Sequence, residues 1–152
     1  MTRASSFEED WQLLEATASW LGRRDYQLAE ERGPEGMNQG LKRFTGRHLD
    51  ISIAADRGQW FVDAAPTEMS DSSFTLEAWS ACLGEPVLFH DNRPRRTDAE
   101  WTERIAGSWH LTPQIEYLQA HLSEMEAVCA PSVISETISR LESARDRLQR
   151  GP

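Results

Sequence analysis

The stretch RHLDISIAADRGQWFVDAAP, from Arg47 to Pro66, decides the fold. Apolar and polar side chains alternate on both sides of its central turn, which is the pattern of two half-buried strands. We therefore predict a β-hairpin. Its buried face is expected to carry Leu49, Ile51, Ile53, Trp60, Val62 and Ala64.

The same alternation restricts the length of the hairpin loop. If Ile51 and Ile53 share a face with Trp60, paired residue numbers must have an odd sum, so the loop must hold an even number of residues. This favours Arg57-Gly58, or Asp56 to Gln59, over a loop of Asp56 to Gly58 that would turn Phe61 inward. With an even loop, the outer face carries His48, Asp50, Ser52, Phe61 and Asp63.

Helical patterns flank the hairpin. Ser6 and Glu9 have capping-box spacing, and the apolar stripe that follows indicates an N-terminal helix ending near Gly22. Tyr26 to Glu31 and Leu41 to Phe44 are expected to be strands, separated by turns at 33–36 and 38–40. The prediction is a small antiparallel sheet of three to five strands, centred on the hairpin at 47–65.

The second half of the chain is expected to be mostly helical. Ser72 or Ser73 is predicted to cap a helix that runs to Gly84, and Pro86 to His90 a short strand beside the hairpin. Asp91 to Arg96 is predicted to be a loop. Thr97 and Glu100 form a second capping-box pair, for a helix that ends at Gly107.

The most regular apolar stripe in the chain lies near its C-terminus. It indicates a helix beginning at Thr112-Pro113, and a last helix from Ile134 to Leu148 is expected to pack against it as an antiparallel partner. The predicted fold class is therefore α+β. The stripe consists of Leu111, Ile115, Leu118, Leu122, Met125 and Cys129.

Composition bounds the class of protein. The chain has 152 residues, of which 39% are hydrophobic and 27% charged, and it includes six tryptophans, as expected of one globular domain over residues 1–152. No segment has the length and apolarity of a leader or a membrane span, so we expect a cytoplasmic protein. Cys82 and Cys129 are expected to be buried thiols, although a single disulfide between them remains open.

Acidic residues dominate the charge pattern. The net charge is −9, and no Lys or Arg occurs between Arg57 and Arg93. Such a surface repels nucleic acid and anionic membranes, and favours a basic protein partner, unless the charge serves only solubility. The candidate partner-binding residues are Asp50, Trp60, Phe61, Asp63, Glu68, Asp71 and Glu77.

In size, charge, the RHLDISI and GQWFVD hairpin and the tryptophan-rich helices, the chain resembles the small immunity proteins of bacterial polymorphic-toxin systems. The resemblance implies a protein that neutralises a cognate toxin by stoichiometric binding. We expect a monomer or homodimer, and, because no segment carries a catalytic or metal-binding motif of useful specificity, no catalysis, no cofactor and no metal. The toxin, or other effector domain, is expected to be basic.

Two other functions remain open. A secretion chaperone is also acidic and α+β, and it would bind an extended segment of its cargo along a strand edge. A small metal-dependent hydrolase would use His48 and Asp50 on one strand face, with His90 and Asp91 completing the ligand set.

Overall fold

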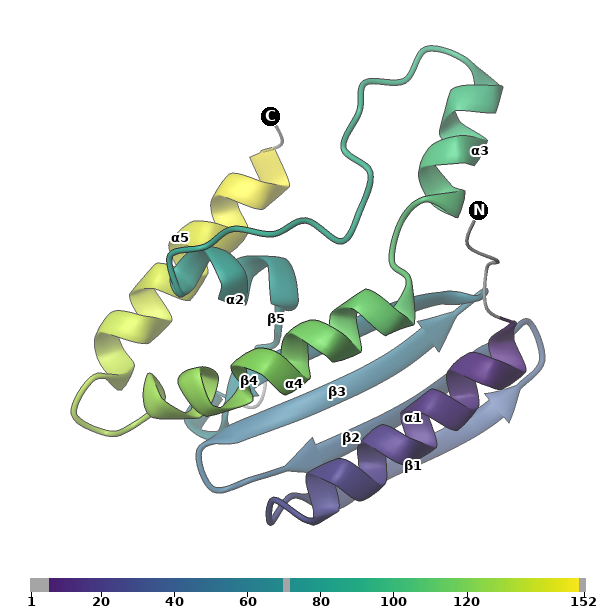
Figure 1. Ribbon diagram of the computed structural model, residues 1–152. Helices are drawn as coiled ribbons and strands as arrows, with labels where there is room; N and C mark the ends of the chain where they lie inside the picture. Colours follow the sequence, from purple (N-terminus) through teal and green to yellow (C-terminus); the bar gives the residue numbers. More distant parts are fainter. Residues whose placement is uncertain (1–5, 70–71, 151–152) are drawn as a thin grey trace.

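A computed structural model describes residues 6–69 and 72–150. The strands form one antiparallel sheet in the order β1-β2-β3-β4-β5 (Figure 1). The elements are α1 (Phe7–Gly22), β1 (Gln27–Glu35), β2 (Gln39–Thr45), β3 (Leu49–Asp56), β4 (Gln59–Pro66), a 3-10 turn (Thr67–Met69), β5 (Phe74–Thr75), α2 (Leu76–Cys82), α3 (Asp98–Ala106), α4 (Leu111–Ala127) and α5 (Ile134–Arg150). The predicted α+β class is confirmed.

The hairpin has the predicted register. Asp56 pairs with Gln59 and Ile53 with Val62, so the loop is Arg57-Gly58 and paired numbers have an odd sum. Both loop residues have positive φ, 55° and 82°, as a two-residue loop matching the strand twist requires. The isoleucines and Trp60 therefore lie on the same face of the sheet.

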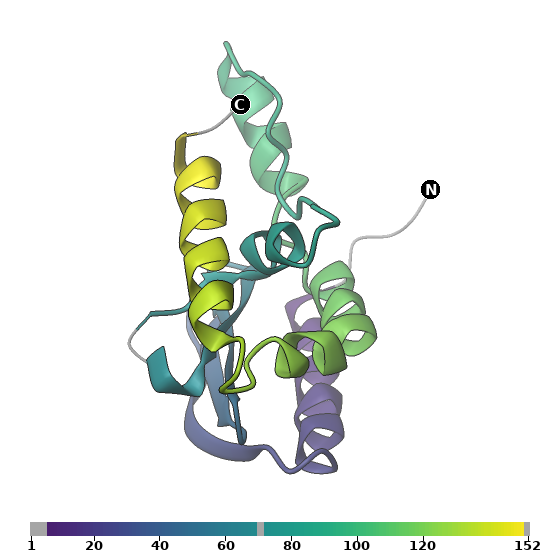
Figure 2. The same cartoon turned by 90° about the vertical axis from the view of Figure 1, so that its left-hand side faces the viewer.

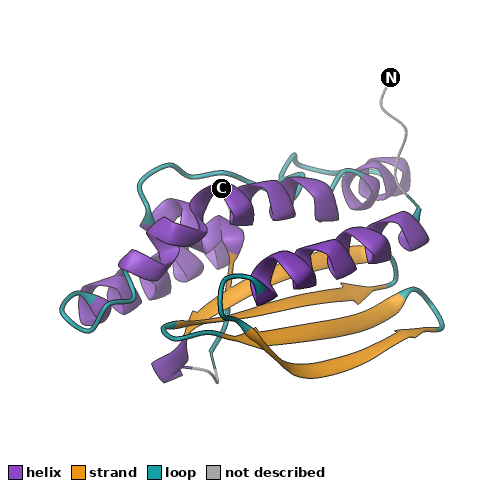
Figure 3. Cartoon of the chain, turned by 60° about the horizontal axis from the view of Figure 1, so that its bottom comes forward, coloured by secondary structure: helices purple, strands orange, loops and turns teal. Residues whose placement is uncertain are grey.

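Helices α1 and α4 cover that face and leave the opposite face of the sheet open (Figures 1 and 3). Trp60 packs between Phe7 and Trp11, at ring-centroid distances of 5.6 and 6.2 Å. The predicted capping box starts α1: the Glu9 N–H donates to Ser6 Oγ at 3.1 Å, and the Ser6 N–H to Glu9 Oε1 at 3.3 Å. The predicted apolar stripe is buried from Leu111 to Met125 on α4, and Cys129, just beyond the end of the helix, is also buried.

The first two strands are longer than expected. Gly33-Pro34 lies inside β1, and the turn falls at Gly36 to Asn38. Because β1 is at the edge of the sheet, a proline there costs no hydrogen bond to a second neighbour. Shifts in the pairing register between Arg32 and Glu35 absorb the irregular backbone.

The segment after the hairpin differs more from the prediction. Phe74 and Thr75 form the short fifth strand, and Thr75, rather than Ser72 or Ser73, caps α2 by accepting from the Ala78 N–H at 3.3 Å. The strand predicted at Pro86 to His90 is wrong, since this segment is a loop. The place beside β4 is already filled, by β5 and by a side chain from α4.

That side chain is Gln114, which completes the edge of β4 where β5 has ended. Its Nε2 donates to the Trp60 carbonyl at 2.8 Å, and its Oε1 accepts from the Val62 N–H at 2.9 Å. The Trp60 N–H donates in turn to the Trp109 carbonyl at 2.9 Å. The buried side-chain amide of Gln114 thus makes the backbone hydrogen bonds that a neighbouring strand would otherwise make.

The last helix does not pair with α4 as predicted, because α5 packs mainly against α2 beyond the edge of β4 and β5. Helix α3 extends away from the body, and none of its residues is buried (Figure 2). None of the helices within 6–69 and 72–150 is long and apolar enough to span a bilayer.

We predict that Gln114→Leu destabilises the protein by about 2 to 4 kcal/mol, because it leaves the buried Trp60 carbonyl and Val62 N–H unpaired. Urea unfolding followed by circular dichroism measures this. Gln119→Leu, at an exposed position of the same helix, is the matched control and should change the free energy of unfolding by less than about 0.5 kcal/mol. Equal effects of the two substitutions would contradict this role of Gln114.

Candidate partner-binding face

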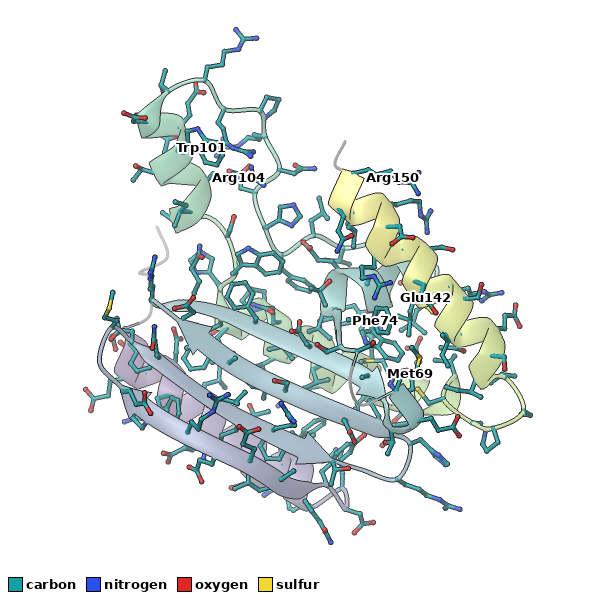
Figure 4. All side chains as sticks on the ribbon, turned by 180° about the vertical axis from the view of Figure 1, so that it is seen from behind. Met69, Phe74, Trp101, Arg104, Glu142 and Arg150 are labelled. Carbon is teal, nitrogen blue, oxygen red and sulfur yellow. The ribbon has the colours of Figure 1, made fainter. Side chains whose placement is uncertain are left out.

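The open face of the sheet, opposite α1 and α4, carries most of the charged residues that the strands contribute; we call it the outer face (Figure 4). One row of directly paired residues crosses all five strands on this face. In order from β1 to β5, the row is Glu30, Arg43, Ser52, Asp63 and Thr75. Asp50 lies beside this row, paired with Thr45 on β2 and Ala65 on β4.

A hollow of about 180 Å³ opens between these side chains. Its polar lining comes from three strands and from the segment before β5. The residues that contribute polar side chains are Arg43, Asp50, Ser52, Asp63 and Ser73. Both carboxylates predicted on the outer strand face therefore line one small cavity.

Asp50 is held in place by two hydroxyl groups. Thr45 Oγ1 donates to Asp50 Oδ1 at 2.8 Å, and Thr67 Oγ1 donates to the same oxygen at 3.2 Å. Because both bonds use Oδ1, the second carboxylate oxygen is left for another donor. The Asp50 carboxylate is thus fixed in position by the protein's own side chains.

Asp63 is the carboxylate of the hollow whose pKa is shifted by burial. Burial removes water from its carboxylate and raises the pKa of Asp63 from 3.8 to about 6. Within the part of the chain that the structure describes, this carboxylate has no hydrogen bond and no ion pair to offset the lost hydration. A partly dehydrated carboxylate without a donor is poised to accept one from a partner.

Arg43 lies on the rim of the hollow without neutralising these two acids. Its Nη2 is 3.5 Å from Glu30 Oε1, and Glu30 also pairs with Arg32 at 3.1 Å. The outer face is therefore of mixed charge on β1 and β2, and unpaired acids lie on β3 and β4. The one-signed surface predicted from the sequence therefore does not extend over β1 and β2.

The remaining predicted residues are dispersed. Phe61 is on the outer face, half buried against Trp109 with ring centroids 5.2 Å apart. Glu68 is exposed on the 3-10 turn after β4. Asp71 lies outside the described residues.

Two predicted residues are buried and cannot form an exposed surface. Trp60 is 1% exposed and belongs to the core, because the hairpin register turns it inward. Glu77 is 4% exposed; its Oε2 accepts from the Phe89 N–H at 2.6 Å and the His90 N–H at 3.2 Å, and lies 2.6 Å from His90 Nδ1. Its charge holds the loop after α2 rather than facing a partner.

Sequence reasoning missed Arg43 and the two threonines that hold Asp50. Arg43 could have been predicted from the sequence, because side chains alternate along the strand from Leu41 to Phe44 and Arg43 therefore lies on the opposite face of the strand from Phe44. Thr67 could not, because its approach to Asp50 depends on how the chain leaves β4.

The metal-site hypothesis finds no support in the arrangement of side chains. Over residues 6–69 and 72–150, no group of three or more His, Cys, Asp or Glu side chains could hold an ion. His90 is engaged with Glu77, and Asp91 with Arg93, whose Nε is 2.9 Å from Asp91 Oδ1.

The two cysteines are free and buried, as predicted. Burial raises the pKa of the Cys129 thiol to about 12 and also raises the pKa of Cys82, although Arg140 opposes the latter shift. Both thiols are therefore poor nucleophiles.

Comparison with known proteins supplies no further constraint: no protein-family model, curated protein or solved structure matches the chain. The case for a function therefore depends on the geometry of the outer face.

We predict that Asp63→Asn stabilises the protein at neutral pH. A carboxyl whose pKa is raised in the folded state favours folding while it is protonated, so this contribution is lost as the pH rises from about 4 to above 6. The variant should gain on the order of 1 to 3 kcal/mol at pH 7.5 and little at pH 4. Thermal unfolding across this pH range measures the difference.

Glu116→Gln is the control, because Glu116 is an exposed carboxylate on α4, on the other side of the sheet. It should leave the pH dependence of unfolding unchanged. A pH profile of Asp63→Asn that runs parallel to wild type would show that Asp63 is not desolvated.

Proposed function

We propose that this chain is a non-catalytic binding protein that neutralises a basic partner by stoichiometric docking on the outer face, in the manner of the bacterial toxin immunity proteins it resembles. The observation that carries the proposal is the unpaired, partly dehydrated carboxylate of Asp63, in a hollow shared with the fixed carboxylate of Asp50. A Lys or Arg side chain of the partner fits this chemistry. Such a partner would be met in the cytoplasm.

The energetics of Asp63 favour a functional role. At neutral pH its ionised carboxylate opposes folding, because hydration is lost and no internal donor replaces it. A cationic side chain entering the hollow supplies that donor, and the charge-assisted hydrogen bond forms where the carboxylate is already partly dehydrated. A feature that lowers stability and raises affinity is typical of a binding site.

The net charge of −9 contributes at longer range. Attraction between an acidic surface and a basic partner accelerates encounter, and the effect weakens as salt screens it. The hollow and the net charge therefore have separate roles. The net charge raises the association rate, and the contact between the partner's cation and the hollow slows dissociation.

Secretion chaperoning is less well supported by the same sheet. A cargo strand would add to the free edge of β1, yet the pairing register of β1 is interrupted twice and the strand contains Pro34. Irregularities and proline on an edge strand hinder the addition of another strand. The outer face has no such obstacle.

The test uses the protein encoded in the neighbouring open reading frame as partner. We expect co-expression of this chain to relieve growth arrest caused by that protein, and a complex with equal copies of each to appear in size-exclusion chromatography with light scattering. Asp50→Asn combined with Asp63→Asn should weaken the complex by roughly 30-fold or more, because two carboxylates lose their charge at the contact.

Glu116→Gln again serves as the control and should leave the affinity unchanged. Relief of arrest without a complex, or no relief at all, would contradict stoichiometric neutralisation. A complex that forms equally well with the double variant would place the contact elsewhere and overturn the role of the hollow. The double variant should remain folded, since Asp63→Asn removes an unfavourable burial.

A further inference from the structure

A second site lies outside the hollow, where the segment between α2 and α4 leaves the body and returns. Residues 85–97 run outward, α3 turns back, and a crevice of about 250 Å³ separates α3 from the body. Trp101 and Arg104 project from α3 toward the segment that precedes it (Figure 4). The crevice is lined by Gln59, His90, Trp101, Arg104, Ile105 and Trp109.

One side of the crevice is formed by His90, whose imidazole is held by contacts with Glu77 and Trp109. His90 Nδ1 is 2.6 Å from Glu77 Oε2, an oxygen that also accepts from two backbone N–H groups, so Nδ1 is the donor in this pair. The imidazole stacks on Trp109, with centroids 5.4 Å apart and planes at 22°. Its Nε2 has no partner within the described residues and is available to a ligand.

The opposite wall is a tryptophan between two arginines. The guanidinium carbon of Arg95 is 3.8 Å from the centroid of the Trp101 ring, and that of Arg104 is 5.9 Å from it. Trp101 is 46% exposed and Ile105 is 56% exposed, so this wall also offers apolar surface to solvent. The combination of aromatic faces and guanidinium groups is suited to planar anions.

These arginines have unused donors. Arg95 Nε and Arg104 Nη1 are buried and lack hydrogen-bond partners among the residues that the structure describes. Two acids of the same segment are engaged with other donors: both oxygens of Asp91 accept from Arg93 Nε, at 2.9 and 2.8 Å, and Glu100 Oε2 accepts from the Arg96 N–H at 2.5 Å. A buried donor without an acceptor is costly, and an anion entering the crevice would satisfy it.

We propose that this crevice binds a small organic anion: a planar aromatic ring that carries a carboxylate or phosphate group. The anionic group pairs with Arg104, the ring lies against Trp101 and Trp109, and His90 Nε2 bonds a polar substituent; Arg95 adds positive charge behind the Trp101 ring. A volume of about 250 Å³ accommodates one or two fused rings. This site shares no lining residue with the hollow, and its ligand chemistry does not depend on the proposed docking function.

The experiment is a ¹H–¹⁵N NMR titration of the full chain with four probes: indole-3-carboxylate, its neutral carboxamide, adenosine monophosphate and adenosine. We expect saturable shifts of the indole N–H signals of Trp101 and Trp109 with an anionic probe, and at least about tenfold weaker binding of its neutral counterpart. Saturation by indole-3-carboxylate identifies a carboxylate site, and saturation by the nucleotide identifies a phosphate site.

Arg104→Gln should weaken that binding by about tenfold or more, because it removes the charge and keeps a planar donor group. No residue of α3 is buried, so the variant is expected to keep the thermal stability of wild type. The control is Arg140→Gln, an exposed arginine on α5 that pairs with Glu136. No saturable shift with either anion up to about 5 mM, equal binding of neutral probes, or an unaffected Arg104→Gln variant would each overturn the proposal.

Discussion

The register of the β3–β4 hairpin is the constraint on which the rest of the structure depends. With Arg57-Gly58 as the loop, Ile51, Ile53 and Trp60 face the helices, and Asp63 faces outward. Because side chains alternate along a strand, a slip of one residue would reverse both faces at once. A slip of β4 would move the Asp63 carboxylate toward the core and the Trp60 indole toward solvent, at a cost of several kcal/mol. The core and the outer face are therefore consequences of the same two-residue loop.

A second constraint follows from the shortness of β5. Since β5 pairs with only two residues of β4, the buried edge of β4 has to find other partners, and it takes them from Gln114 and from the main chain of Trp109. This requirement fixes where the chain must return after α2. The returning Trp109 N–H also donates to the Phe89 carbonyl at 2.7 Å, so residues 90–108 form an excursion closed at its base. The crevice beneath α3 exists because that excursion is anchored at both ends.

Local chemistry made part of this predictable from the sequence. Strand alternation gave the hairpin and placed Asp50 and Asp63 on one face, and capping boxes located the starts of α1 and α3. The predictions that were wrong concern features that depend on long-range contacts. The sequence predicts that Glu77 is a surface acid on a helix. It is buried because residues 89–90 fold back onto α2. Likewise, the apolar run from Pro86 to His90 resembles a strand, but Gln114 already occupies the edge that it would join.

Net charge is a weaker guide to binding than the environment of individual carboxylates. On the outer face, Glu30 is shared between two arginines, so an acid of that kind adds to the total charge but offers little to a partner. Asp63 differs because burial has already removed part of its hydration, so a cation that met it would lose less free energy to desolvation than at a fully hydrated acid. A single dehydrated acid can thus determine where a cation docks on a surface of mixed charge, and the acids around it act mainly by raising the rate of encounter.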